Sequence, residues 1–305
     1  MGWVCLALSI SPAVGQVFLV IDTTRLALNP DREGNPMQWF PFRLTSVTEY
    51  TLSASTRWLV NSATRDEPGH VLLQHAFRFT WTIVKEGKVA CTHSFSHRLG
   101  FLYLFDSVTR IQADENLFRT HLDLYITGIA GIAFDSEIST RLFTGYDYLK
   151  DDSGRMERRL NSSFLTPLIW NLSAGISFKI PGTGSGMIGL SGVKLTCLRD
   201  TSVFTEQQAV IYQGVRKGHD HLLEYGLSCR FQADRSFWKI VRWNCDMLIF
   251  KGYNKPADLN FRNLFEIRPV SFLVISLQTR VWYEEDISRR ICTENLLSVG
   301  FSLKK

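Results

Sequence analysis

The sequence predicts an all-β fold, a closed antiparallel transmembrane β-barrel of about twelve strands. From residue 42 onwards, segments of alternating apolar and polar residues recur, as expected for strands whose two faces meet different surroundings. These segments run for about 12 to 18 residues, longer than strands of soluble sheets and long enough to cross a bilayer at a tilt. Short turns alternate with longer polar connections, which is typical of outer-membrane barrels.

The first forty residues are expected to precede the barrel. Trp3 to Ile10 form an apolar core, and the small residues Ala13 to Gly15 follow it, as in a signal peptide with its cleavage site. We therefore expect residues 1–15 to be an export signal, although no Lys or Arg precedes the apolar core. The alternative for this segment is a buried strand. Residues 16–40 are expected to form an N-terminal periplasmic segment or a plug, and residues 41–305 the barrel.

Two predicted hairpins show the alternation most clearly. Residues 122–127 and 134–146 each place apolar side chains on one face and polar or charged side chains on the other. Residues 223–231 and 241–247 repeat the pattern. One wall of the predicted barrel is therefore apolar and faces lipid, whereas the other is ionic and faces the lumen.

The connections predict the topology. Short turns are expected at Lys85–Lys88, Gly128–Gly131, Pro181–Gly186, Asp234–Ser236 and Pro269–Ser271. Longer polar connections are expected at Ser53–Gly69, Asp106–Asn116, Lys150–Leu160, Asp200–His219, Gly252–Asp258 and Glu284–Arg290. From a first strand near Phe42–Thr51 to a last one near Ile291–Leu303 we count about twelve strands, with about ten and about fourteen as alternatives. An even number places both termini at the short-turn side, which is periplasmic in the bacterial outer membrane.

Composition agrees with a barrel and excludes other classes. The chain of 305 residues is 45% hydrophobic and 21% charged, and no apolar run of about 18 residues follows the N-terminal segment. A soluble β-sandwich, the competing interpretation, would need many bends in strands this long. No phosphate-binding glycine loop or nucleic-acid module occurs, and the net charge of +5 is modest. We therefore expect no cofactor and no nucleic-acid partner.

Six cysteines in an exported chain would ordinarily suggest disulfides. Cys5 lies in the predicted signal, and the pattern does not place Cys292. A turn at Asp234–Ser236 would leave Cys229 and Cys245 about two residues out of register, so a bridge between them is not expected. The cysteines on the apolar parity, where a thiol behaves as a small hydrophobe, are Cys91, Cys197, Cys229 and Cys245.

The lumen is the expected seat of function, because strand parity directs many charged side chains inward. Ten of these are basic and six acidic. Charges of both signs would pair across strands and narrow the barrel, and the basic excess would favour anions along an open path. We therefore expect a narrow channel or transport component for small solutes, whose cargo the sequence does not identify. The alternative is a structural or envelope-assembly barrel without a pore. The predicted lumen-lining residues are Arg78, Arg98, Asp123, Asp135, Glu137, Arg141, Lys179, Lys194, Glu224, Arg230, Arg242, Asp246, Arg262, Glu266, Arg268 and Arg280.

An enzyme is the third interpretation, since a membrane barrel can carry a Ser and His pair that hydrolyses lipid. His75, His93 and His97 take the lipid-facing parity, but no serine motif accompanies them. His219 and His221 would share a strand face, yet no further His or Cys lies near them in the sequence. We therefore expect no catalytic residue and no metal site.

An acidic run occurs in one predicted outer loop. Glu284, Glu285 and Asp286 could hold a divalent cation that bridges to lipopolysaccharide. The alternative is a solvated acidic loop. Outer-membrane lipid and lipopolysaccharide are accordingly the expected membrane partners.

Several short motifs follow one another through the C-terminal half. They are Thr144–Tyr148, Leu190–Thr196, Glu224–Gly226, Ile249–Pro256, Asp258–Phe261, Trp282–Ile287 and Glu294–Leu303. In this order they resemble a Bacteroidetes-type outer-membrane β-barrel family known only as a domain of unknown function. The resemblance implies a barrel fold, an outer-membrane location and assembly by the barrel-assembly machinery, and it implies no activity. The family typically ends in an aromatic residue, whereas this chain ends in Leu303-Lys304-Lys305, and Leu190–Thr196 lacks a proline that the family pattern leads us to expect.

Overall fold

The computed structural model describes residues 8–9, 18–19, 42–60, 71–85, 88–103, 109–150, 156–206, 210–237, 240–284 and 288–304. It divides into two units, Met1–Pro41 with Lys305, and Phe42–Lys304. In the first unit, β1 (Leu8–Ser9) and β2 (Phe18–Leu19) pair antiparallel. The remainder of the predicted signal and of the predicted 16–40 segment lies outside the described residues.

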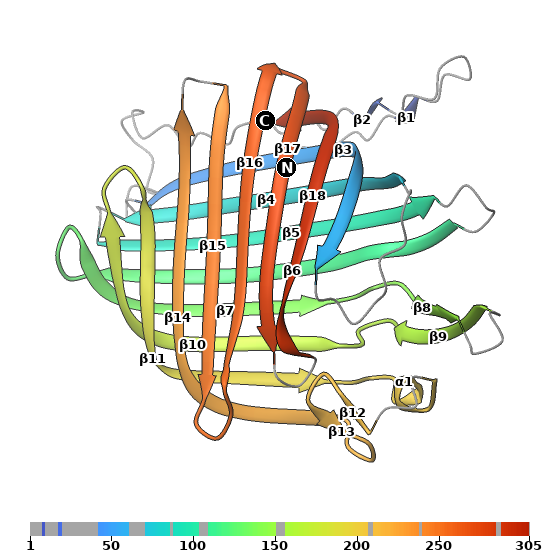
Figure 1. Ribbon diagram of the computed structural model, residues 1–305. Coiled ribbons are helices and arrows are strands. Elements are labelled where there is room, and N and C mark those ends of the chain that lie inside the picture. Colours follow the sequence, from blue (N-terminus) through green and yellow to red (C-terminus); the bar gives the residue numbers. More distant parts are fainter. Residues whose placement is uncertain are drawn as a thin grey trace. The chain divides into compact units, whose positions relative to one another are not determined.

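The second unit is a closed antiparallel barrel (Figure 1). Each strand pairs with the next along the chain, and the last pairs with the first. Twelve of the strands described within Phe42–Lys304 form the barrel, so the predicted fold class and strand number are confirmed. The strands are β3 (Phe42–Val60), β4 (Val71–Lys85), β5 (Val89–Tyr103), β6 (Thr109–Tyr125), β7 (Ala130–Thr140), β10 (Leu168–Ile180), β11 (Gly184–Cys197), β14 (His221–Phe237), β15 (Val241–Gly252), β16 (Ala257–Val270), β17 (Leu273–Glu284) and β18 (Ser288–Lys304).

The seam between β18 and β3 closes the ring. Gly300 lies opposite Ser53 in this pairing, and a Cβ atom on Gly300 would lie only 2.3 Å from the carbonyl oxygen of Leu52. The close approach of the two backbones therefore requires glycine at this position. Closure pairs the edges that long apolar strands would otherwise expose to other chains.

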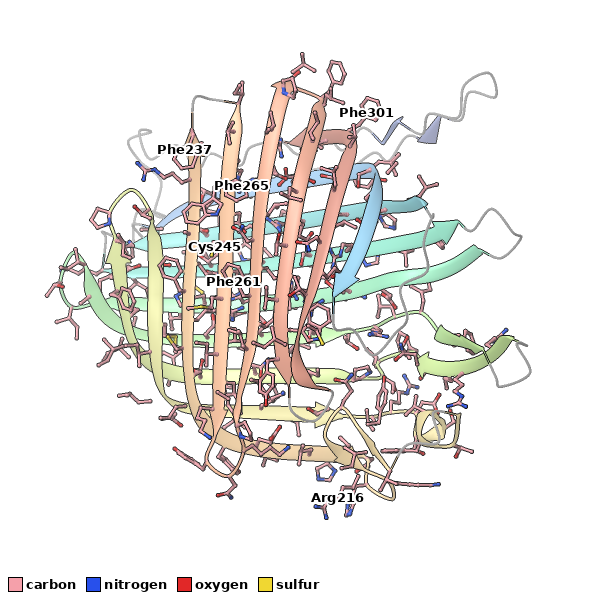
Figure 2. All side chains as sticks on the ribbon, viewed as in Figure 1. Arg216, Phe237, Cys245, Phe261, Phe265 and Phe301 are labelled. Atoms are coloured by element: carbon pink, nitrogen blue, oxygen red, sulfur yellow. The ribbon has the colours of Figure 1, made fainter. Side chains whose placement is uncertain are left out.

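The two faces of the barrel have opposite character. On β7, Ile132 and Phe134 are exposed, whereas Ala133 and Asp135 between and beside them are buried. Phe265 on β16 and Phe301 on β18 are also exposed (Figure 2). A water-soluble protein buries its large apolar side chains and exposes its charges, whereas here the outer wall is apolar and the inner wall is charged. This is the distribution of a barrel that crosses a membrane.

One predicted turn is wrong. Asp234–Ser236 lie within β14, and the pairing of Phe237 with Val241 moves the turn to residues 238–240. Asp234 faces Arg242 at 2.5 Å between Oδ2 and Nη2, so this polar stretch is the lumen-facing end of a strand. The pairing also shifts the cysteines, since Cys229 lies opposite Ile249 and Cys245 opposite Ala233.

The β14–β15 hairpin contains Cys229 and Cys245. The two cysteines of this hairpin are further out of register than expected, and neither is in a disulfide. Cys292, which the sequence did not place, is buried on β18. Its parity with Leu296 and Ser298, which are also buried, puts it on the inner wall.

Several strands are longer than predicted at the end with the longer connections. β3 runs to Val60 and β6 begins at Thr109, so the connections expected at Ser53–Gly69 and Asp106–Asn116 are shorter. Gly252–Asp258 and Glu284–Arg290 shorten in the same way, because β16 begins at Ala257 and β18 at Ser288. The strand predicted over 134–146 instead ends at Thr140.

The two longest connections contain structure of their own. β8 (Gly145–Lys150) and β9 (Met156–Ser162) form a hairpin between β7 and β10. Between β11 and β14 lie α1 (Ser202–Glu206), β12 (Ile211–Tyr212) and β13 (Val215–Arg216). Among the described residues, no helix is long and apolar enough to cross a membrane.

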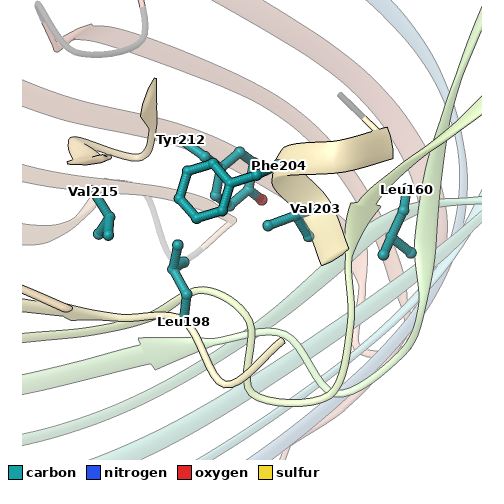
Figure 3. Packing of buried hydrophobic residues seen from close by; sticks show 6 residues of the cluster. All are labelled: Leu160, Leu198, Val203, Phe204, Tyr212 and Val215. Atoms are coloured by element: carbon teal, nitrogen blue, oxygen red, sulfur yellow. The ribbon is translucent and has the colours of Figure 1, made fainter. Parts of the chain in front are cut away.

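These two connections share a small apolar core, which we call the loop core (Figure 3). The Tyr212 hydroxyl donates a hydrogen bond to the carbonyl of Asn161, which ties the second connection to the first. Side chains of the loop core are almost fully buried, unlike the outer wall of the barrel. The loop core consists of Leu160, Leu198, Val203, Phe204, Tyr212 and Val215.

Candidate functional site: the charged lumen

The centre of the charged inner wall is an ion-pair network that we call the Arg230 cluster. Arg230 Nη1 lies 2.6 Å from Asp135 Oδ2, its Nη2 pairs with Glu137, and its Nε lies 3.2 Å from Asp246 Oδ1. Arg119 Nη2 lies 2.7 Å from the other oxygen of Asp135. β14 and β7 are separated in the ring by β10 and β11, so these contacts pass through the lumen.

A histidine extends the Arg230 cluster along β6. His121 Nδ1 lies 2.9 Å from Asp135 Oδ1, and its Nε2 lies 3.2 Å from Asp123 Oδ2. The Tyr125 hydroxyl donates to the same oxygen of Asp123 at 2.9 Å. The ammonium of Lys179 on β10 lies 4.0 Å from the centre of the Tyr125 ring. Hydrogen bonds and ion pairs therefore connect the Arg230 cluster to Tyr125, and a cation–π contact continues from Tyr125 to Lys179.

A second network, the Glu115 cluster, joins β5, β6 and β17. Arg98 Nη2 donates to Glu115 Oε2 at 2.7 Å, and Arg280 Nη1 donates to Glu115 Oε1 at 2.8 Å. Arg98 Nη1 also donates to Gln278 Oε1 at 3.2 Å. β18, β3 and β4 lie between β17 and β5 in the ring, so these bonds also pass through the lumen.

A third network, the Glu49 cluster, joins β3 to β15 and β16. Glu49 pairs with Arg268 and lies 3.7 Å from Arg242, measured from Oε2 to Nη1. Arg242 in turn pairs with Asp234, and Glu266 Oε2 lies 3.5 Å from Arg268 Nη2. The Glu49 cluster thus contains three predicted lumen residues, Arg242, Glu266 and Arg268.

The remaining predicted residues have individual positions. Lys194 Nζ lies 2.8 Å from Asp258 Oδ2, and Glu224 Oε1 lies 2.9 Å from Lys255 Nζ. Arg78 is the cross-strand partner of Glu49.

Arg262 is the cross-strand partner of Arg280 and therefore shares its face of the sheet. Arg141 lies just beyond the end of β7 and not on a strand, contrary to the prediction. Its charge nevertheless acts on Glu115. Both residues therefore belong to the surroundings of the Glu115 cluster.

Sequence reasoning missed several charged residues of the inner wall, among them Arg119, His121, Glu115 and Glu49. Arg119 and His121 precede Asp123 on the same parity, and Glu115 follows from the same alternation extended backwards. Glu115 was missed because Asp106–Asn116 was expected to be a loop. Glu49 alternates with the apolar residues of β3 and could have been found by that pattern.

Two of the three histidines on the lipid-facing parity are hydrogen-bonded, and the third, His75, contacts the ring of His97. His97 Nδ1 lies 2.6 Å from Asn116 Oδ1, and the centres of the His75 and His97 rings are 5.0 Å apart. His93 lies 2.9 Å from Thr120 Oγ1 and 3.2 Å from the sulfur of Cys91. In the part of the chain that the structure describes, neither His75 nor His97 bonds to a serine, threonine or cysteine.

The predicted metal-binding alternatives gain no ligand set from the structure. His221 Nδ1 lies 2.6 Å from Asp220 Oδ1. Within the described residues, no group of three or more His, Cys, Asp or Glu side chains could hold a metal ion. Glu285 and Asp286 of the acidic run lie outside the described residues.

The chain matches no protein-family model and no curated protein. Solved structures similar to it include an outer membrane channel from Pseudomonas putida F1, at 10% identity and a TM-score of 0.41, covering 90% of this chain and 100% of that one. The translocator domain of the autotransporter NalP from Neisseria meningitidis has 8% identity and a TM-score of 0.36, covering 87% and 90%. The KdgM porin in complex with disordered oligogalacturonate has 8% identity and a TM-score of 0.32, covering 85% and 99%. At these scores the likeness carries no functional argument, and the fold rests on the strand pairing itself.

Proposed function

We propose that this chain is a narrow channel or transport component for small solutes in the bacterial outer membrane, with its short turns on the periplasmic side. The proposal rests chiefly on one observation, which is that the charged side chains of the lumen are buried in the Arg230 cluster and partly exposed in the Glu115 cluster. The apolar outer wall supports the membrane location. The first barrel strand begins and the last one ends at the short-turn end, which supports placing that end in the periplasm.

The filled side is the part of the wall that holds the Arg230 cluster, on β6, β7 and β14. In the Arg230 cluster the side chains of Asp135 and Arg230 are only 5% and 7% exposed. In the Glu115 cluster, by contrast, the side chains of Glu115 on β6 and Arg280 on β17 are 34% and 24% exposed although they lie inside the ring. Arg78 is exposed outright. Charged groups inside a barrel are exposed only where water occupies the lumen, so we infer a water path along β3 to β5 and β16 to β17.

A cavity of about 650 Å³ opens at the short-turn end, beside the filled side of the lumen and not along the inferred water path. It is lined by the turn between β10 and β11 together with polar side chains of β14 and β15. Lys179, Gln232, Asp234 and Asn244 are among the lining residues. A cavity of this size is large enough for a small solute.

Single-channel conductance of the refolded protein in a planar bilayer tests the proposal. Arg78→Glu reverses a charge on the proposed path, and Arg216→Glu makes the same change at an exposed position of the β12–β13 hairpin. We expect the unmodified protein to conduct, Arg78→Glu to alter the conductance and the anion-to-cation permeability ratio, and Arg216→Glu to alter neither. A folded, heat-modifiable barrel that never conducts would overturn the channel.

The second candidate is a structural or envelope-assembly barrel. The observation in its favour is that ion pairs of all three clusters cross the lumen, and such pairs can hold a barrel closed. Membership of the Bacteroidetes-type family, the barrel-assembly machinery as partner and the lipid-hydrolase alternative remain predictions.

A further inference from the structure

Two arginines face each other beside the Glu115 cluster. Arg262 on β16 and Arg280 on β17 are directly opposite in the strand pairing and point to the same face. Like charges in this arrangement destabilise a sheet. A bound anion would compensate this repulsion between the two guanidinium groups. Whether the pair can bind one depends on how many negative charges already lie around it.

The surroundings hold more positive than negative charge. Glu115 is the shared acceptor of Arg98 and Arg280, and the charges of Arg262 and Arg141 act on the same carboxylate. The second acidic group is Glu294, the cross-strand partner of Arg280. Four arginines therefore share two glutamates among the residues that the structure describes here.

The acidic neighbour of Arg262 on its other side is already engaged. Asp246 is the cross-strand partner of Arg262, but its carboxylate accepts hydrogen bonds from Arg230 and Gln232. Within the described residues, Arg262 makes no ion pair. Arg280 Nε is buried and has no hydrogen-bond partner there either. In the described part of the chain, Arg262 and Arg280 thus both retain N–H donors without a hydrogen-bond partner, on the neighbouring strands β16 and β17.

We propose that Arg262 and Arg280 form a binding site for an oxyanion, either a carboxylate or a phosphate group, of a solute in the lumen. This inference rests on the proposed channel and names its substrate class as small anions. A guanidinium presents its N–H donors in a planar fork that matches two oxygens of such a group. Glu115 positions Arg280 by accepting a hydrogen bond from Nη1, and Arg98, which donates to the same carboxylate, adds positive charge.

The site is tested by binding, independently of conduction. The folded protein in detergent is dialysed to equilibrium against radiolabelled inorganic phosphate, with unlabelled acetate as competitor in a second arm. Arg262→Gln removes one half of the proposed site, and Arg78→Gln removes another lumen arginine outside it. We expect phosphate binding that Arg262→Gln weakens about tenfold, as for loss of one charge-assisted hydrogen bond, and that Arg78→Gln leaves within about twofold.

The outcomes separate the site from the channel. Displacement by acetate identifies a general oxyanion site, whereas binding that acetate does not displace identifies a phosphate site, and both support the proposal. Absence of phosphate binding, or an equal loss in Arg78→Gln, overturns it. Phosphate binding in a protein that never conducts would sustain the site and overturn only the channel. Conductance without phosphate binding would sustain the channel and overturn only the binding site.

Discussion

Arg230 Nη1 and Asp135 Oδ2 lie 2.6 Å apart although 95 residues and two barrel strands separate them. Both side chains are nearly inaccessible to solvent. A buried charge whose partner is removed is left without compensation, and this penalty exceeds what the ion pair itself contributes. The Arg230 cluster is therefore where the barrel is most sensitive to loss of a single charge.

Replacing Arg230 by Gln is expected to lower the free energy of unfolding by about 3 to 5 kcal/mol, because Asp135 and Glu137 lose their shared cation. Urea unfolding of the refolded protein, followed by the loss of heat-modifiable mobility, measures this change. Arg78→Gln serves as control, since Arg78 is exposed and should change the unfolding free energy by less than about 0.5 kcal/mol. Equal effects of the two substitutions would show that the Arg230 cluster is not the stabilising centre.

The strand order and wall parity were predictable because they depend on local alternation. Residues 122–125 and 241–247 lie on β6 and β15 with the faces expected from period two. The cross-lumen contacts were not predictable in this way. The closure and stagger of the whole ring decide which residue of β7 contacts Arg230. The sequence of a single strand determines neither.

The prediction of a turn at Asp234–Ser236 failed because the residue types there fit both a turn and the end of a strand. Asp and Ser favour turns, but charged residues also occur where the end of a strand faces a watery lumen. Glu115 was missed for the converse reason, because the first part of β6 has too few apolar residues to look like a strand. Both errors lie at strand ends, where the distinction between lipid-facing and lumen-facing residues weakens.

Replacing Ile176 by Lys tests the membrane-facing wall. Ile176 lies near the middle of β10 on the exposed apolar face, opposite Ile188. A lysine there is expected to lower the free energy of unfolding from a bilayer by about 2 to 4 kcal/mol, since the charge would enter hydrocarbon. Ile211→Lys is the matched control, because Ile211 is an exposed residue of β12 outside the barrel. If both variants unfolded like the parent in lipid vesicles, the apolar wall would not face hydrocarbon.

Replacing Gly300 by Val tests the closing seam. The added side chain would collide with the backbone of β3 at Leu52, so β18 and β3 could not pair at their present separation. We expect a large loss of the heat-modifiable, folded fraction after refolding. Val299→Leu changes a neighbouring exposed residue of the same strand and should refold normally. Normal refolding of Gly300→Val would mean that the seam tolerates a wider spacing.

Replacing Phe204 by Ala tests the loop core. Phe204 is almost fully buried between the two long connections, and loss of such a side chain destabilises its surroundings by about 3 to 5 kcal/mol. We expect faster tryptic cleavage after the exposed residues Arg216 and Lys217, with the barrel itself still heat-modifiable. Val210→Ala alters an exposed residue of the same connection and should leave the cleavage rate unchanged. Unfolding of the whole barrel with Phe204→Ala would show that the loop core is not a separate unit.

The carboxylate of Asp200 should make the start of α1 sensitive to acid. The hydroxyl of Ser202 donates to Asp200 Oδ1 at 2.6 Å and the Ser202 backbone N–H at 3.0 Å, and these bonds hold the pKa of Asp200 below its ordinary 3.8. A carboxyl group whose pKa is lower in the folded state stabilises that state above its unfolded pKa, and the contribution disappears as pH falls through the folded value. The amide chemical shift of Ser202, followed by NMR against pH, should therefore titrate with a midpoint below 3.8, and Asp200→Asn should abolish the titration. A midpoint at or above 3.8, or an unchanged titration in Asp200→Asn, would show that Asp200 does not stabilise the start of α1 through these bonds.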